Sequence, residues 1–442
     1  MNSLKSRAQD IFRLRFVREI AILQSGMFVP LLCGFLSSIL YARLLGLTGY
    51  GTYAVVLAFT GVIGLFTNLG QRFTTLTFLA EAYGRKDQEA MRNVLQYYIL
   101  LSFGTIFMLA LLFVALPSIA LWLYHGTEIG QLARLVLLAS MFDPLFILLS
   151  ISLQTVREIR FLTIIENTYS VVQLSLGIFF VMEGMGPAGL LVGSLLTSVL
   201  SMALAIILYP VVARRHGLPS PRDIGALHGL AHLWTYAKSG LWIAIDKSLS
   251  NLYPNVFLFI LSLHSSQAIV GLVRLAFKFA SLPASYVLSN ISRLASSVVP
   301  SLVAKGTHLG RDLIRLLRYS FLLHWSISLL TAIVVPLLFP IIYGKDFGPA
   351  IYPFWIILAS QLFLPLFAVT TPLFRLYGKV RLTALCSLVG TAAGLLAFLL
   401  LTPVLQATWA LYIAICLYQL TTLSLVFPAV GLLRTASRPS TT

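Results

Sequence analysis

Long apolar runs follow one another along almost the whole chain, separated by short polar segments. A helix of about 20 mostly apolar residues crosses a bilayer, and only elements that satisfy their own backbone hydrogen bonds are stable in lipid. Such runs lie at residues 23–44, 50–70, 94–118, 130–154, 161–182, 187–212, 239–263, 266–291, 316–343, 350–374, 382–404 and 407–433. The pattern predicts an all-α polytopic membrane protein with about twelve transmembrane helices.

The composition agrees with this prediction. Hydrophobic residues make up 58% of the chain and charged residues only 10%, against about 25% charged in an ordinary soluble domain. A water-soluble fold is therefore excluded. The polar segments between the runs are too short to form a separate soluble domain.

The net charge of +17 reflects membrane topology. Of the 31 Lys and Arg residues, 25 fall before the first run, after every second run, or in the tail, and the opposite loops hold only Lys345. Because cytoplasmic loops carry an excess of Lys and Arg, this distribution predicts that both termini are cytoplasmic, and it argues against nucleic-acid binding. Residues 1–22 form a predicted basic, amphipathic segment on the cytoplasmic membrane surface.

An internal repeat divides the chain into halves. Gly51 and the apolar run after it align with Gly271 and its run at an offset of 220 residues, and two further pairs of segments match at nearly the same offset. We therefore predict two pseudo-symmetric six-helix lobes around a central cavity, as in transporters that hold substrate between repeated halves. The predicted parts are an N-lobe at 23–212, a cytoplasmic loop at 213–238, a C-lobe at 239–433 and a cytoplasmic tail at 434–442.

Charged residues inside the predicted spans are the candidate functional residues. The cations are Arg43, Arg134, Lys247, Arg274 and Lys278, and the acids are Asp143, Glu166 and Asp246. A charge at the centre of a spanning helix costs about 3 kcal/mol and almost always faces a water-filled cavity or another charge.

The cations predict an anionic substrate. Arg274 and Lys278 are four residues apart on one helix face, in a span without acidic residues, so they repel each other unless water or an anionic ligand separates them. We expect Arg43, Lys247, Arg274 and Lys278 to line the cavity, because Arg and Lys both bind phosphate groups. Arg134 lies near a span end and can extend to the interface.

The acidic residues have two interpretations. Asp143, Glu166 and Asp246 either form salt bridges or bind a coupling proton or sodium ion. Asp246 adjoins Lys247, but adjacent helical residues point about 100° apart, so the two need not pair. No metal-binding pattern, ATP-binding motif or other cofactor signature is present. The paired acids of a membrane-embedded glycan polymerase or transferase are also missing, so we expect a transporter and not an enzyme.

The stretch Tyr41–Gly70 resembles the polysaccharide-biosynthesis, Wzx-type oligosaccharide flippases of the superfamily that also contains multidrug exporters. An ARxLG sequence and a following yGxYA-like turn carry the resemblance, through Ala42, Arg43, Leu45, Gly46, Tyr50, Gly51, Tyr53 and Ala54. In the second half, Ala268–Pro283 is similar to the family's vGxYxxA element, with Val273 in place of the usual tyrosine. Tyr343–Ser360 and Thr371–Thr383 are similar to its C-terminal elements.

This resemblance implies a flippase that moves a polyprenyl-pyrophosphate-linked oligosaccharide across the cytoplasmic membrane by alternating access, for a surface polysaccharide such as O-antigen. The implied partners are the lipid-linked substrate, membrane lipids and other membrane proteins of polysaccharide assembly. A multidrug exporter, or an exporter of another lipid-linked precursor, is the alternative within the superfamily. An embedded polymerase or transferase is the alternative from another class.

Overall fold

The computed structural model describes residues 26, 28–67, 71–220, 254–288, 309–376, 380–424 and 428. Across these residues the chain is helical and contains no strand. Six helices in this part of the chain are long and apolar enough to cross a membrane, and two shorter apolar helices accompany them. The prediction of an all-α polytopic membrane protein is confirmed.

Helix α3 (Phe28–Thr67) holds the first two predicted spans. Its 40 residues would extend about 60 Å if straight, twice the apolar thickness of a bilayer. The backbone breaks at Gly46, where φ is 66° and ψ is −177°, a conformation that is open only to glycine. The Gly46 kink therefore divides α3 into two spans, as the sequence predicts.

The chain separates into two compact units. Unit 1 comprises Met1–Gly49 and Ile63–Ala244, and unit 2 comprises Tyr50–Val62 and Ile245–Thr442. The segment Tyr50–Val62, in the second span of the predicted N-lobe, thus groups with unit 2. The predicted termini at 1–22 and 434–442, and most of the predicted loop at 213–238, lie outside the described residues.

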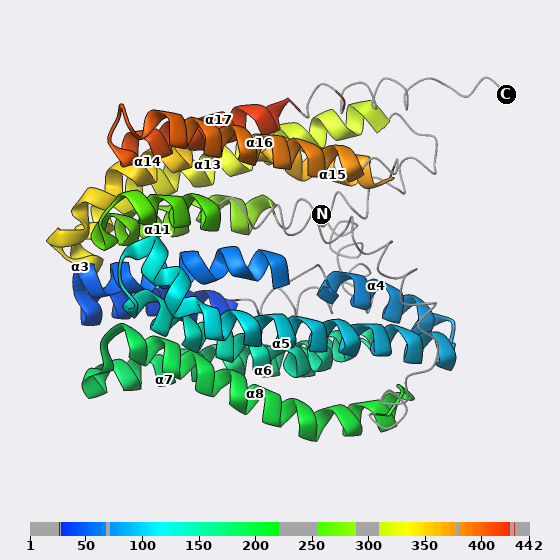
Figure 1. Cartoon of the computed structure of the whole chain (residues 1–442). Helices are drawn as coiled ribbons and strands as arrows, with labels where there is room; N and C mark the ends of the chain where they lie inside the picture. Colours follow the sequence, from blue (N-terminus) through cyan, green and yellow to red (C-terminus); the bar gives the residue numbers. More distant parts are fainter. Residues whose placement is uncertain are drawn as a thin grey trace. The chain divides into compact units, whose positions relative to one another are not determined.

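Unit 1 contains a bundle of long helices. After α4 (Gln71–Gly84) come α5 (Gln88–Tyr124), α6 (Glu128–Thr155), α7 (Ile159–Phe180), the π-helical turn η1 (Val181–Met185) and α8 (Gly186–His216). Helix α6 packs against both α5 and α8, and α7 packs against α8 (Figure 1). Helix α5 begins at a cap in which Asp87 Oδ1 accepts a hydrogen bond of 2.9 Å from the Ala90 amide.

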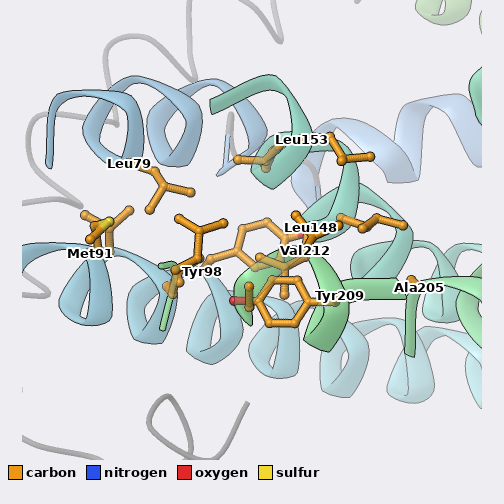
Figure 2. Packing of buried hydrophobic residues seen from close by; sticks show 14 of the residues in the cluster. Leu79, Met91, Tyr98, Leu148, Leu153, Ala205, Tyr209 and Val212 are labelled. Carbon is orange, nitrogen blue, oxygen red and sulfur yellow. The ribbon is translucent and has the colours of Figure 1, made fainter. Parts of the chain in front are cut away.

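A buried apolar cluster joins the five helices α4, α5, α6, α7 and α8. Figure 2 shows Leu79 of α4, Tyr98 of α5, Leu148 of α6 and Tyr209 of α8 in this cluster. Burying each such side chain contributes about 1.5–3 kcal/mol relative to an exposed position. The cluster holds α4 against the bundle, so most of the connection between the second and third predicted spans is a packed helix. Thr75, Leu79 and Ala82 recur at helical spacing on the buried face of α4.

Unit 2 is also helical. A helix at Pro254–His264 precedes α11 (Gln267–Ala280), η2 (Ala284–Leu288), α13 (Leu309–Tyr343), η3 (Lys345–Ala350), α14 (Ile351–Ser360), α15 (Leu364–Leu376), α16 (Val380–Leu401) and α17 (Ala407–Leu423). Helices α16 and α17 pack side by side (Figure 1), and α11 packs against α14.

The predicted span at 350–374 is not one helix. Helix α14 ends at Ser360 and α15 begins at Leu364, since Pro365 has no amide hydrogen to donate to the Gln361 carbonyl four residues earlier. Side chains of α13 bind the carbonyls at this break. His324 Nε2 lies 3.2 Å from the Gln361 oxygen, and Trp325 Nε1 donates to the Leu362 oxygen at 3.0 Å.

Candidate functional site

Two cations of α11 form the centre of the candidate site in unit 2. Arg274 and Lys278 are both half-buried and lie close enough to interact electrostatically. At 1.5 Å per residue, they stand about 10 Å and 17 Å along the helix from its first residue, Gln267. Both residues belong to the span predicted at 266–291, and their role as cavity cations stays a prediction.

The second half of α3 contacts α11 backbone to backbone. A Cβ atom added to Gly51 would collide with the carbonyl group of Gln267, and one added to Gly271 would lie 3.0 Å from the Gly51 Cα. Thr52 Oγ1 donates a hydrogen bond of 2.7 Å to Gln267 Oε1 beside this contact. Small residues permit such approach of membrane helices, and here the two glycines that the repeat aligns contact each other.

Aromatic side chains lie near Arg274 of this pair. Tyr50 and Tyr53 both interact electrostatically with Arg274, and their ring centroids are 6.2 Å apart. The Phe347 ring lies edge-on to the Tyr50 ring, with centroids 6.2 Å apart. It is tilted against the Tyr343 ring, with centroids 6.0 Å apart. Together these residues combine positive charge, hydroxyl groups and ring faces, a set that suits a ligand with an anionic part and a polar ring.

Of the other two predicted cavity cations, one belongs to unit 1 and one lies outside the described residues. Arg43 is exposed on the first half of α3, three residues before the Gly46 kink, and belongs to unit 1. Lys247 and its neighbour Asp246 lie outside the described residues. The structure thus brings together two of the four predicted cations, Arg274 and Lys278.

Arg134 has a structural explanation. Pro117 of α5 cannot donate a hydrogen bond to the Phe113 carbonyl, and the Nε of Arg134 donates to that oxygen at 2.8 Å. The guanidinium also lies 5.0 Å from the centre of the Phe113 ring. A side chain from a neighbouring helix therefore satisfies a backbone group that proline leaves free.

The two described acids have different partners within unit 1. Glu166 of α7 lies 3.6 Å from the Nη2 of Arg72 on α4. The Oδ1 of Asp143 on α6 accepts a hydrogen bond of 2.8 Å from Ser198 on α8. Glu166 thus takes part in a salt bridge, whereas Asp143 is held by a neutral hydroxyl group.

Arg72 is the residue that the sequence interpretation missed. Its charge was used only to predict topology, whereas the structure places it in the first turn of α4 with an ion pair to α7. The helical recurrence of Thr75, Leu79 and Ala82 after it was the available signal. Among the described residues, no group of three or more His, Cys, Asp or Glu side chains could hold a metal ion.

Solved transporter structures share this fold. An inward-facing multidrug resistance MATE family transporter of the MOP superfamily matches with a TM-score of 0.73 and 16% identity, over 95% of this chain and 99% of that one. The eukaryotic MATE transporter AtDTX14 matches with a TM-score of 0.65 and 17% identity, over 96% of this chain and 99% of that one. A MOP superfamily transporter from Pyrococcus furiosus matches with a TM-score of 0.64 and 14% identity, over 96% of each chain. At these identities the likeness establishes the two-lobed fold alone.

Sequence comparison identifies the family. A search of curated proteins gives no match. The family model described as polysaccharide biosynthesis protein matches residues 40–352, which is more than half of the chain and includes both Gly51 and Gly271. The chain is therefore a multi-pass membrane protein with the fold of MOP superfamily transporters, and it belongs to the polysaccharide biosynthesis protein family.

Proposed function

We propose that this protein is a flippase that carries a polyprenyl-pyrophosphate-linked oligosaccharide across the cytoplasmic membrane by alternating access. The observation that carries the proposal is the pair Arg274 and Lys278, two like charges one turn apart at membrane depth. The sequence of α11 has no carboxylate to balance them. An anionic ligand would remove their repulsion.

A lipid-linked oligosaccharide fits the chemistry of this cluster. Its pyrophosphate would bind the cations, the Arg274 guanidinium as a planar fork and the Lys278 ammonium as a point charge. The sugar would use the hydroxyl and ring face of Tyr53, which is partly exposed, while the prenyl chain stays in lipid. The membership in a polysaccharide biosynthesis family supports a glycan as cargo.

The fold alone also permits a multidrug exporter, because the similar MATE structures are of multidrug transporters. Polarity separates the two functions. The Pyrococcus furiosus transporter has a binding pocket of reverse polarity that suggests a different function for that protein. The basic cluster on α11 likewise favours an anionic cargo over a cationic drug.

A membrane-embedded glycan polymerase or transferase is the alternative from another class. Such an enzyme would transfer sugar in purified form, without a requirement for Arg274 or Lys278. The described residues offer no paired carboxylates for this chemistry, since Asp143 and Glu166 have separate partners in unit 1. The transporter function therefore agrees better with the side chains that are present.

The experiment replaces both α11 cations in the native host. The Arg274→Ala/Lys278→Ala variant should abolish surface polysaccharide while its amount in the membrane remains normal. The charge-conserving Arg274→Lys/Lys278→Arg variant is the matched control and should keep most of the export. Extraction of lipids should show the undelivered lipid-linked glycan on the inner leaflet, and its chemical analysis would identify the sugar.

Two results would contradict the proposal. Normal surface polysaccharide in the double alanine variant would remove the cations from the mechanism. Sugar-transfer activity of the purified protein, unchanged in that variant, would support the enzyme. Because the protein amount is measured in the same membranes, loss of folding is separated from loss of transport.

A further inference from the structure

The Arg72–Glu166 pair in unit 1 has the features of an anion-binding site that is closed by an internal carboxylate. The separation of 3.6 Å between Arg72 Nη2 and Glu166 Oε1 is long for an ion pair, and the two side chains remain 50% and 38% exposed. A pair that served only structure would be expected to be shorter and better covered. The Arg72 side chain keeps part of its hydrogen-bonding capacity open.

The depth of this pair indicates that its exposed side faces water. Helix α7 has 22 residues, about 33 Å, which matches the apolar layer of a bilayer. Glu166 lies seven residues after the first residue of α7, Ile159, about 10 Å into that layer. Because exposed charges at this depth face a water-filled cavity and not lipid, Arg72 is accessible to a polar ligand.

The surroundings of Arg72 favour an anion. Arg72 occupies the first turn of α4, where the free backbone amides and the helix dipole attract negative charge. On the same helix face one turn later, Thr75 is 0% exposed and its hydroxyl has no hydrogen-bond partner, as is also true of the neighbouring Thr74. Buried hydroxyl groups without partners are costly, and a ligand oxygen that binds there would satisfy them.

The Arg72–Glu166 pair connects helices α4 and α7. Helix α4 packs against α5 and α6, and α7 packs against α6 and α8, so the two long side chains reach each other beside α6. Gln71, the residue before Arg72, is fixed by hydrogen bonds to the Tyr98 carbonyl and to Ser102 on α5. The start of α4 is thus held in place, whereas the Arg72–Glu166 contact can open.

We infer that Arg72 forms a second anion-binding site, within unit 1, for a pyrophosphate head group, and that Glu166 occupies this site until the substrate arrives. This inference rests on the proposed function, because it takes the substrate anion as the ligand. The phosphate oxygens replace the Glu166 carboxylate on the Arg72 guanidinium, and they accept hydrogen bonds from Thr75. Glu166 is therefore a competitor of the substrate, so its removal strengthens binding.

The test measures binding of inorganic pyrophosphate, and of farnesyl pyrophosphate, to the full chain in lipid nanodiscs. Arg72→Gln should weaken binding at least about tenfold, the loss of a charge-assisted hydrogen bond. Glu166→Gln should instead tighten binding about two- to fivefold, the strength of a partly exposed ion pair. Farnesyl pyrophosphate should bind more tightly than inorganic pyrophosphate if the site takes a lipid head group, and equally if it takes a free anion.

The same helix offers a matched control. Arg85 and Glu81 form an exposed ion pair at the other end of α4, and Glu81→Gln and Arg85→Gln should leave both affinities unchanged. A purely structural Arg72–Glu166 bridge would give weaker or unchanged binding in Glu166→Gln, together with a lower melting temperature. That result overturns the inference even if Arg72→Gln fails to fold, because the inference predicts that Glu166→Gln binds pyrophosphate more tightly than the wild type.

The outcome also separates this inference from the proposed function. If Arg274→Gln/Lys278→Gln abolishes binding while Arg72→Gln and Glu166→Gln match the wild type, the inference fails and the flippase remains. If the wild-type protein binds neither pyrophosphate, both fail. Opposite shifts in Arg72→Gln and Glu166→Gln support the inference.

Discussion

The two units treat charge inside the membrane differently. In unit 1, Arg134 binds backbone carbonyls, Glu166 lies beside Arg72, and Asp143 accepts a hydrogen bond from Ser198. In unit 2, Arg274 and Lys278 stand together on α11, and the neighbours of Arg274 are tyrosines. The partners in unit 1 come from neighbouring helices of that unit, whereas α11 in unit 2 carries two cations and no carboxylate of its own.

This difference gives a criterion for intramembrane charges in transporters of this fold. Burial in the membrane is costly for every charged side chain. The neighbours of a charge therefore indicate whether it serves the fold or binds a ligand. Arg134 binds a carbonyl that proline leaves free, so its charge inside the membrane needs no ligand. Substitution of Arg134 should therefore affect stability. The two cations of α11, a helix without an acid, are the ones that we propose to serve a ligand, so their removal should affect transport.

The largest effect is expected where the α3 and α11 backbones touch in unit 2. Gly51→Ala places a methyl group against the Gln267 carbonyl, and such overpacking costs about 1–3 kcal/mol, occasionally more. We expect a marked loss of thermal stability in detergent and of export. Gly104→Ala in α5 is the control, because no heavy atom lies within 4 Å of its added Cβ. An equal effect of both substitutions would show that the close contact is not important.

The sequence predicted the elements better than the contacts. Apolar run length locates most spans because bilayer thickness fixes it, and the repeat identifies Gly51 and Gly271 as equivalent. That these two glycines touch depends on the three-dimensional arrangement, which spacing does not contain. Arg72 was missed because polar residues at the start of α4 suggested a loop. The break at Gln361 was missed because apolar composition continues through it, although Pro365 indicated it.

The next largest effect concerns Arg134 in unit 1. Arg134→Leu leaves the Phe113 carbonyl without a donor, because Pro117 has no amide hydrogen, and a buried unsatisfied group costs about 1–3 kcal/mol. Adding Pro117→Ala supplies the missing amide within α5 and should restore most of the melting temperature. Thermal unfolding of the single and double variants measures this rescue. If Pro117→Ala gives no rescue, Arg134 acts through its charge, and the contrast between the units weakens.

A smaller effect is expected for the hydrogen bond beside the glycine contact. Thr52→Val removes the donor to Gln267 Oε1, which contributes about 0.5–1.5 kcal/mol. Gln267→Leu should cost a similar amount, and the double variant should cost less than the sum, because the two residues share one interaction. Additive losses in this double-mutant cycle would mean that the bond does not stabilise unit 2.

The smallest effect on stability, and the finest test of the comparison, concerns Asp143. Asp143→Asn keeps an oxygen to accept the Ser198 hydrogen bond, so we expect thermal stability to change by less than about 1 kcal/mol.

Asp143 has no ion pair with a described cation, in contrast to Glu166, so a coupling proton or sodium ion would have to balance its charge. If it binds one, export by Asp143→Asn becomes independent of the imposed proton or sodium gradient, whereas Glu166→Gln keeps the wild-type dependence. Flux assays in proteoliposomes under each gradient measure this. An unchanged dependence in Asp143→Asn would make Asp143 as structural as Arg134.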